Sequence, residues 1–109
     1  MNRPKKPRKA SARAARRATE RATARVQKLR ERLFATEPGS SAGRPVRVES
    51  ASVIEPHARA MPCPRCEGPL QVKEHRAETF EGHRLREVRV RCQQCGSERS
   101  LWYELEMAN

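Results

Sequence analysis

The sequence predicts a small metal-stabilised β fold, in which a three-stranded antiparallel sheet is preceded by a basic helix and a linker. Three observations lead to this fold class. Four cysteines form two C-x2-C pairs in the second half of the chain. Apolar and polar residues alternate between and after these pairs, which is the pattern of strands. The first third carries apolar residues at helical spacing on a strongly basic background.

The 109 residues leave room for one small domain with tails. Hydrophobic residues make up 36% of the chain and charged residues 34%, which is too polar for a large core. The net charge of +11 is concentrated in residues 1–36, which hold thirteen lysines and arginines and two glutamates. Residues 37–109 hold eleven of each sign. A basic block of this kind is typical of a tail or helix that binds a polyanion.

The basic block divides into an arm and a helix. Residues 1–10 contain two prolines and five cations, so we expect a disordered basic arm. Residues 11–36 are expected to form a basic amphipathic helix, with Ser11 as its N-cap and Pro38-Gly39 as its stop signal. Its apolar stripe consists of Ala15, Ala18, Ala22, Val26, Leu29 and Leu33.

The polar face of this helix carries the candidate nucleic-acid contacts. Like charges at this density repel one another along a helix, and phosphate groups would neutralise that repulsion. We therefore expect a helix that is partly formed alone and firmer when bound. Two alternatives remain open: a solvated helix, or one that packs Val26, Leu29 and Leu33 on a neighbour. The candidate cations are Arg13, Arg16, Arg17, Arg21, Arg25, Lys28 and Arg32.

Residues 37–60 have the composition of a linker, because glycine, proline and serine recur through them. Two short apolar pieces, at residues 46–48 and at Val53-Ile54, either dock on the following domain or belong to the linker. His57 lies near the first cysteine, but we expect it at the surface because four thiolates already complete a ligand set.

The four cysteines are expected to hold one structural zinc ion. Each C-x2-C turn places two sulfurs on one ion, and two such turns give the tetrahedral set of four sulfurs that suits zinc. The 25 residues between the pairs suffice for a hairpin that brings the second pair back to the first. The expected ligands are Cys63, Cys66, Cys92 and Cys95.

Three other chemistries fit these cysteines less well. A disulfide framework requires an oxidising compartment, and no export signal is evident. A thioredoxin-like dithiol requires a βαβ context around a single pair. Iron bound by four sulfurs ranks below zinc, because little aromatic shielding surrounds the cysteines.

The domain is expected over residues 61–106. Residues 69–80 and 83–92 read as a hairpin with its turn at Glu81-Gly82, and residues 99–105 read as the third strand. About eight apolar side chains are too few to hold such a domain together, so removal of the metal should unfold it. The side chains expected to face inward are Leu70, Val72, Phe80, Val88, Val90, Leu101, Tyr103 and Leu105.

On these residues the chain resembles the zinc ribbon superfamily. The stretches "CPRCEG", "VRVRCQQCGS" and "SLWYEL" carry the resemblance, which covers roughly residues 61–106. It implies the fold and the metal but no single function, because ribbons occur in transcription factors, ribosomal proteins, enzymes and adaptors.

The interval between the pairs is similar to that in the transcript-cleavage ribbon of elongation factor S. That family uses an adjacent Asp-Glu pair at the hairpin tip. Here the tip reads Glu78-Thr79-Phe80-Glu81 and the chain has no aspartate. The resemblance therefore does not extend to that activity.

We expect a non-enzymatic protein, because four cysteines leave no open coordination position and no small-molecule substrate is evident. The first hypothesis is binding of RNA, DNA or a ribonucleoprotein by the basic segment. Arg89, Arg91 and Trp102 of the sheet would then be weaker contacts. The alternative is a protein-interaction adaptor, in which the neutral ribbon docks a protein partner and the basic segment is an electrostatic anchor.

No apolar run approaches the length of a membrane span or a signal-peptide core. We therefore expect an intracellular protein that is cytoplasmic or associated with the nucleoid or the ribosome. The arginine- and alanine-rich N-terminus also has the composition of an organelle transit peptide, which is the alternative for a eukaryotic source.

Overall fold

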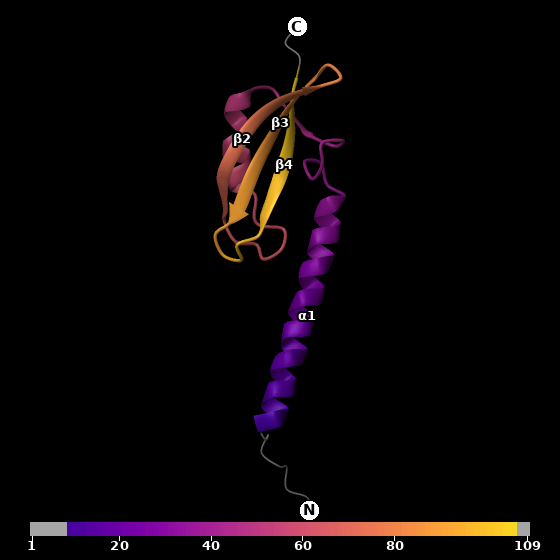
Figure 1. The fold of residues 1–109 in the computed structure, drawn as a ribbon, viewed down its shortest axis with the longest axis vertical. Coiled ribbons are helices and arrows are strands. Elements are labelled where there is room, and N and C mark those ends of the chain that lie inside the picture. The colour runs from indigo at the N-terminus through magenta and orange to yellow at the C-terminus, as the bar shows by residue number, and fades with distance from the viewer. Residues whose placement is uncertain (1–8, 107–109) are drawn as a thin grey trace, which may run out of the picture.

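A computed structural model describes residues 9–106 of the chain and shows one long helix beside a small sheet (Figure 1). The strands lie in the order β1-β4-β3-β2. Strand β3 pairs antiparallel with β2 and with β4, whereas β1 pairs parallel with β4. The elements are α1 (Lys9–Ala35), β1 (Val46–Val48), the 3-10 helix η1 (Ala51–Val53), α2 (Ile54–Ala60), β2 (Leu70–Phe80), β3 (His83–Cys92) and β4 (Glu98–Leu105).

The three strands predicted from the alternating pattern are present, but the sheet has four. The turn of the β2–β3 hairpin lies at Glu81 and Gly82, whose φ values of 49° and 81° match the mirror-image turn that suits twisted strands. The fourth strand, β1, comes from residues 46–48, for which the sequence left docking on the domain and a place in the linker both open. The prediction of a three-stranded sheet is therefore wrong in this respect.

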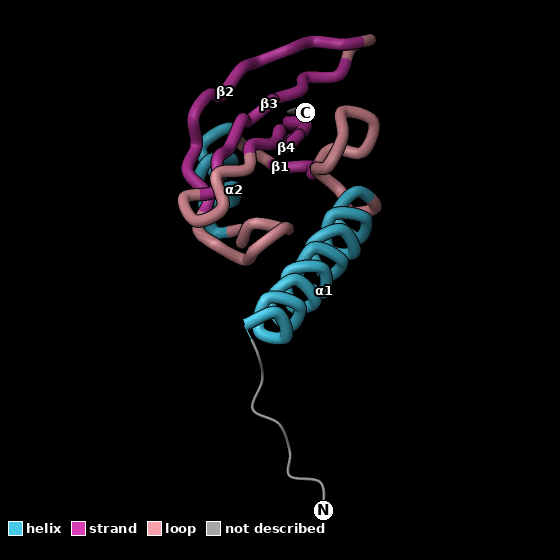
Figure 2. Tube along the Cα trace, turned by 60° about the horizontal axis from the view of Figure 1, so that its bottom comes forward, coloured by secondary structure: helices cyan, strands magenta, loops and turns pink. Residues whose placement is uncertain are grey.

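The linker predicted over residues 37–60 holds three short elements that complete the fold. Val46 and Val48 lie opposite Tyr103 and Leu105 of β4, so β1 extends the sheet at that edge. Ile54 and Ala58 of α2 are fully buried against the sheet. Helix α2 covers one face of the sheet, which three bare strands would leave in water (Figure 2).

The hydrophobic core lies between this face and α2. Val88, Leu101 and Tyr103 are at most 1% exposed, as the predicted inward face requires. The hydroxyl of Tyr103 lies 2.8 Å from Nδ1 of His57, so the exposed edge of α2 supplies its hydrogen-bond partner. Burial raises the pKa of Tyr103 to about 12.

Phe80 departs from the prediction, because it was expected to face inward with Leu70 and Val72 but is 62% exposed. The register between β2 and β3 shifts between Val72 and Glu74. The extra residue of this bulge reverses which side chains of β2 face the core beyond that point. The next half-buried residue of the strand is therefore His75 and not Glu74. Phe80 therefore lies on the opposite face of the sheet from Leu70.

Helix α1 extends away from the sheet and contacts it through its C-terminal turns (Figure 1). It begins at Lys9, so Ser11 lies inside the helix and is not its N-cap. The arm predicted over residues 1–10 lies outside the described residues, apart from the two that begin α1. Within residues 9–106, no helix combines the length and the apolar character that crossing a membrane requires.

The face of α1 that docks on the sheet is not the predicted apolar stripe. Phe34 is buried, and the Arg99 guanidinium lies 5.2 Å from its ring centroid. Glu31 accepts two hydrogen bonds from Arg99, of 2.6 and 3.0 Å. Val26, Leu29 and Leu33 lie on another side of the helix and are 46%, 56% and 67% exposed.

Candidate metal centre

Two loops of nearly identical backbone geometry carry the four cysteines. In the first loop, the N–H of Glu67 donates to the carbonyl of Cys63, and in the second the N–H of Gly96 donates to that of Cys92. Glu67 and Gly96 have φ values of 66° and 76°, so each loop turns back through the left-handed region. Glycine adopts this conformation at little cost, whereas glutamate does so under strain. The first loop therefore makes the same turn as the second despite the different residue.

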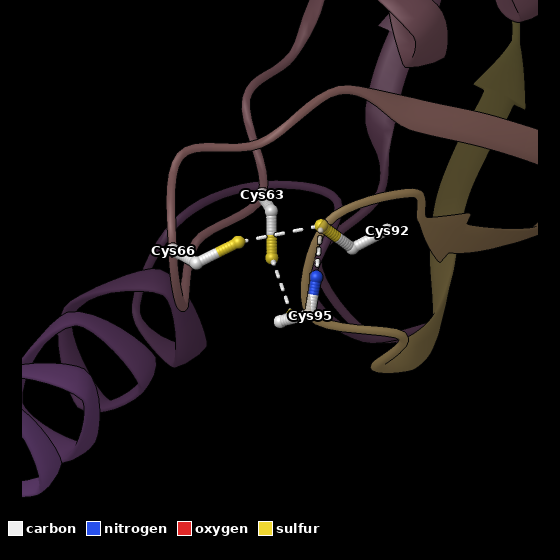
Figure 3. A group of neighbouring side chains, drawn as sticks. All are labelled: Cys63, Cys66, Cys92 and Cys95. Carbon is white, nitrogen blue, oxygen red and sulfur yellow. Dashed lines mark hydrogen bonds between the residues drawn. The ribbon is translucent and has the colours of Figure 1, made fainter.

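The loops bring the four sulfurs together around a common centre (Figure 3). The ligand atoms of the four cysteines all lie within 4.8 Å of one another. The Sγ atoms of Cys63 and Cys95 are 3.8 Å apart, and those of Cys66 and Cys92 are 3.3 Å apart. A tetrahedral ion with metal–sulfur bonds of about 2.3 Å has sulfur–sulfur edges of about 3.8 Å. The spacings, from 3.3 Å to no more than 4.8 Å, bracket this edge, so the cluster could hold a single metal ion.

Backbone N–H groups point at the sulfurs, as a set of thiolates requires. The N–H of Gly68 lies 3.4 Å from Sγ of Cys66. The N–H groups of Gln94 and Cys95 lie 3.3 and 3.4 Å from Sγ of Cys92. The hydroxyl of Ser97 lies 3.0 Å from Sγ of Cys95. These contacts stabilise negative charge on sulfur and orient the ligands.

The same contacts set the pKa values of the thiols. Hydrogen bonds from the side chain and backbone of Ser97 lower the pKa of Cys95 to about 6. Burial raises the pKa of Cys63, but hydrogen bonds from backbone N–H groups and from Ser97 outweigh it, so that this pKa is lowered. The Gly68 N–H lowers the pKa of Cys66, but burial and the neighbouring sulfurs raise it to about 12. A bound cation would favour the thiolate form throughout the cluster.

Arg99 links the cluster to the C-terminal turns of α1. Its pKa is raised chiefly by the hydrogen bonds to Glu31 and further by the charge of Cys63. The same hydrogen bonds lower the pKa of Glu31. Two further contacts join α1 to the first cysteine loop: Arg30 to Glu67 at 3.4 Å, and Arg65 to Gln27 at 3.4 Å.

No family model, no curated protein and no solved structure matches this chain. The four cysteines nevertheless lie close enough together to hold a metal ion, and the chain combines this cluster with an N-terminal helix and a mixed sheet.

The candidate nucleic-acid contacts lie on two separate surfaces. Arg89 and Arg91 lie on the face of the sheet opposite α2, where Arg89 lies 4.0 Å from Glu98 and 3.3 Å from the hydroxyl of Ser100. Trp102 lies on the same face and is half-buried. The exposed cations of α1 are Arg13, Arg16, Arg17, Arg21, Arg25, Lys28 and Arg32.

The sequence interpretation missed the residues that support the ligands. Ser97 donates to a ligand sulfur, and its only signal is its position two residues after Cys95. Glu31 and Arg99 are 68 residues apart, so no local pattern joins them. Glu31 stands out in the sequence only as one of two acids in a basic segment.

Proposed function

We propose that the cysteine cluster holds one structural zinc ion and that residues 61–106 form a zinc ribbon. Four clustered sulfurs support zinc, because structural zinc sites are commonly tetrahedral sets of four cysteine thiolates. The cluster lies at one end of the β2–β3 hairpin (Figure 1). The hairpin tip, with Phe80 and Glu81, lies at the opposite end. The residues that would hold the ion are Cys63, Cys66, Cys92 and Cys95.

The protein is proposed to be a binding protein without catalytic activity. Four sulfur ligands would fill the coordination sphere of zinc and leave no position for a substrate or an activated water. The zinc would serve to join the two cysteine loops, and the energy of metal binding would appear as folding energy.

Its proposed ligand is nucleic acid, or a ribonucleoprotein, bound through α1. One observation carries this proposal: seven exposed cations lie along a helix that extends away from the domain. Within residues 11–106 none of the seven lies in an ion pair. A row of unpaired cations attracts phosphates and releases their counterions, whatever the base sequence.

The sheet is proposed to contribute less. Its outer face carries ion pairs between neighbouring strands, among them Arg76 with Glu87 at 2.7 Å and Arg89 with Glu98 at 4.0 Å. An arginine that is paired with a carboxylate must break that ion pair before it binds a phosphate. Arg89, which pairs with Glu98, is therefore proposed as a weaker contact than the cations of α1. This neutral face also leaves the adaptor hypothesis as the alternative.

The salt dependence of binding tests the proposal. Fluorescence anisotropy with a labelled RNA and a labelled DNA duplex should give affinities that fall steeply with salt, with a slope of about −0.7 to −0.9 per phosphate neutralised. Replacing four helix cations with glutamine should reduce the magnitude of that slope by about 3 to 4. The four helix substitutions are R13Q, R16Q, R17Q and R21Q.

A control with the same change of net charge separates position from total charge. The control carries R44Q, R47Q, R59Q and R84Q, which lie outside α1 and outside the candidate contacts of the sheet. The control should keep most of its affinity if α1 is the interface. Equal loss in both variants would show that only the net charge matters, and no binding at low salt would overturn the proposal.

A further inference from the structure

The side of α1 that carries the apolar stripe remains open to solvent near the cysteine loops. Val26, Leu29 and Leu33 follow one another at spacings of three and four residues and are 46%, 56% and 67% exposed. None of them contributes to the core cluster of the described residues. Three large aliphatic side chains in one line are an exposed apolar surface of the kind that marks an interaction site.

A groove continues this surface onto the first cysteine loop. It has a volume of about 270 Å³ and lies between the end of α1 and the residues around Cys63. Leu33 lines it from the helix, and Met61, Pro62 and Pro64 line it from the loop. Its lining also includes Glu37 and the ion pair of Arg30 with Glu67. The stripe and the groove thus form one surface, with a flat part on the helix and a hollow that admits an apolar side chain.

The charges beside this surface define the partner that would fit it. Arg25 and Arg32 directly precede Val26 and Leu33, so they lie along one flank of the stripe. Neither forms an ion pair within residues 11–106. We propose that this surface binds a protein partner through an acidic amphipathic helix, whose leucine-like side chains cover the stripe and enter the groove.

The other candidate occupants fit this surface less well. A second copy of the chain would bring its own +11 charge of residues 1–36 against the first, which opposes close pairing of two α1 helices. Nucleic acid offers phosphates to Arg25 and Arg32 but little apolar surface to Leu29 and Leu33. A helix-in-groove partner satisfies both the apolar and the charged groups.

A designed peptide tests the proposal without knowledge of the natural partner. The probe is a helical peptide of about 18 residues with leucines at i, i+3, i+4 and i+7 spacing and glutamates beside them. Its control is a scrambled peptide of the same composition. In anisotropy measurements with the full chain at ~0.15 M salt, the patterned peptide should bind at least about tenfold more tightly than the scramble.

Variants of the chain locate the binding surface. The double substitution L29S/L33S should weaken binding of the patterned peptide by about tenfold or more. The matched control V53S/F80S also removes two exposed apolar side chains and should change binding by no more than about twofold. Circular dichroism should check that α1 remains helical in L29S/L33S, because serine is a poorer helix former than leucine.

Several outcomes would overturn the proposal. Equal binding of the patterned and scrambled peptides would mean that charge alone attracts them. Unchanged binding by L29S/L33S would place the surface elsewhere. If the same two leucines instead drive sedimentation of the chain with anionic lipid vesicles, or its self-association in sedimentation velocity, the partner class is wrong. Nucleic-acid binding should persist in L29S/L33S, so failure here is distinguishable from failure of the proposed function.

Discussion

Replacing Gly68 with alanine should damage the metal centre directly. A Cβ atom at this position would lie 2.7 Å from Cβ of Gln94, 3.0 Å from Sγ of Cys92 and 3.2 Å from Sγ of Cys66. Carbon atoms that are not bonded prefer a separation of about 3.5–4.0 Å. The contact with Gln94 involves an atom fixed to the backbone of the second loop, so the two loops must move apart.

Such overpacking costs about 1–3 kcal/mol. Because the loops that would move apart carry the ligands, we expect the cost to appear as weaker metal binding, by about 10- to 100-fold. Competition for zinc with a chromophoric chelator measures this change, and thermal unfolding of the metal-bound protein should report the same destabilisation.

Gly43 provides the matched control, because no atom lies within 4 Å of a Cβ added there. The variant G43A should keep its zinc affinity and change stability by no more than about 0.5 kcal/mol. If G68A binds zinc as tightly as the unmodified chain and G43A, the close approach of the two loops is not what closes the site.

Three further predictions test the fold. Chelation of the metal should unfold the sheet, seen as loss of the near-ultraviolet signal of Trp102; a chelated protein with an unchanged spectrum would contradict a structural metal. The variant E31Q should lower stability by about 1 kcal/mol or less at neutral pH, because the carboxylate of the pair with Arg99 is partly exposed. The pKa of Glu31 is lowered in the fold, so its contribution is present above its unfolded pKa and is lost as the pH falls through its folded pKa. If the stability difference between E31Q and the unmodified chain persisted at a pH below the folded pKa of Glu31, the ion pair with Arg99 would not be its cause. The variant H57A should cost about 1–3 kcal/mol by leaving the buried hydroxyl of Tyr103 without its partner, whereas Y103F, which removes the hydroxyl itself, should cost less in the same denaturant titration.

The alternating pattern located the long strands because each has one face in the core. The prediction over residues 83–92 coincides with β3, whose Val88 and Val90 are buried between polar neighbours. The bulge in β2 was not predictable, because an extra residue at Lys73 reverses the alternation without leaving a compositional mark. The error at Phe80 follows from this single insertion.

For the two apolar pieces within residues 37–60, the sequence left docking on the domain open and did not decide it, for a different reason. Helix α2 buries only Ile54 and Ala58, one turn apart, which is too short a pattern to establish a period. Strand β1 has three residues, and its pairing with β4 depends on a contact more than fifty residues away in sequence. Strand β1 is stabilised by pairing with the sheet and α2 by packing on it, so the formation of both is a tertiary effect.

The cysteine cluster was predictable from the sequence, and its surroundings were not. Spacing alone identifies Cys63 and its three partners, because two C-x2-C turns can converge on one ion wherever the chain between them folds back. The role of Gly68 depends on how closely the second loop approaches the first, and the role of Ser97 depends on the direction of its hydroxyl. Neither distance is encoded in the local sequence.

The contacts at the end of α1 divide that helix into two parts with different sources of stability. Beyond Gln27, the helix is held by Phe34 in the core and by Glu31 on Arg99, which also interacts with Cys63. The preceding turns have no such support, and their arginines repel one another. A metal ion bound by the cysteine loops would therefore also fix the direction in which α1 leaves the domain. The stability of the outer turns then depends on what neutralises their charge, which is why the proposed phosphate ligand should increase the helix content of the N-terminal part and not that of the docked end.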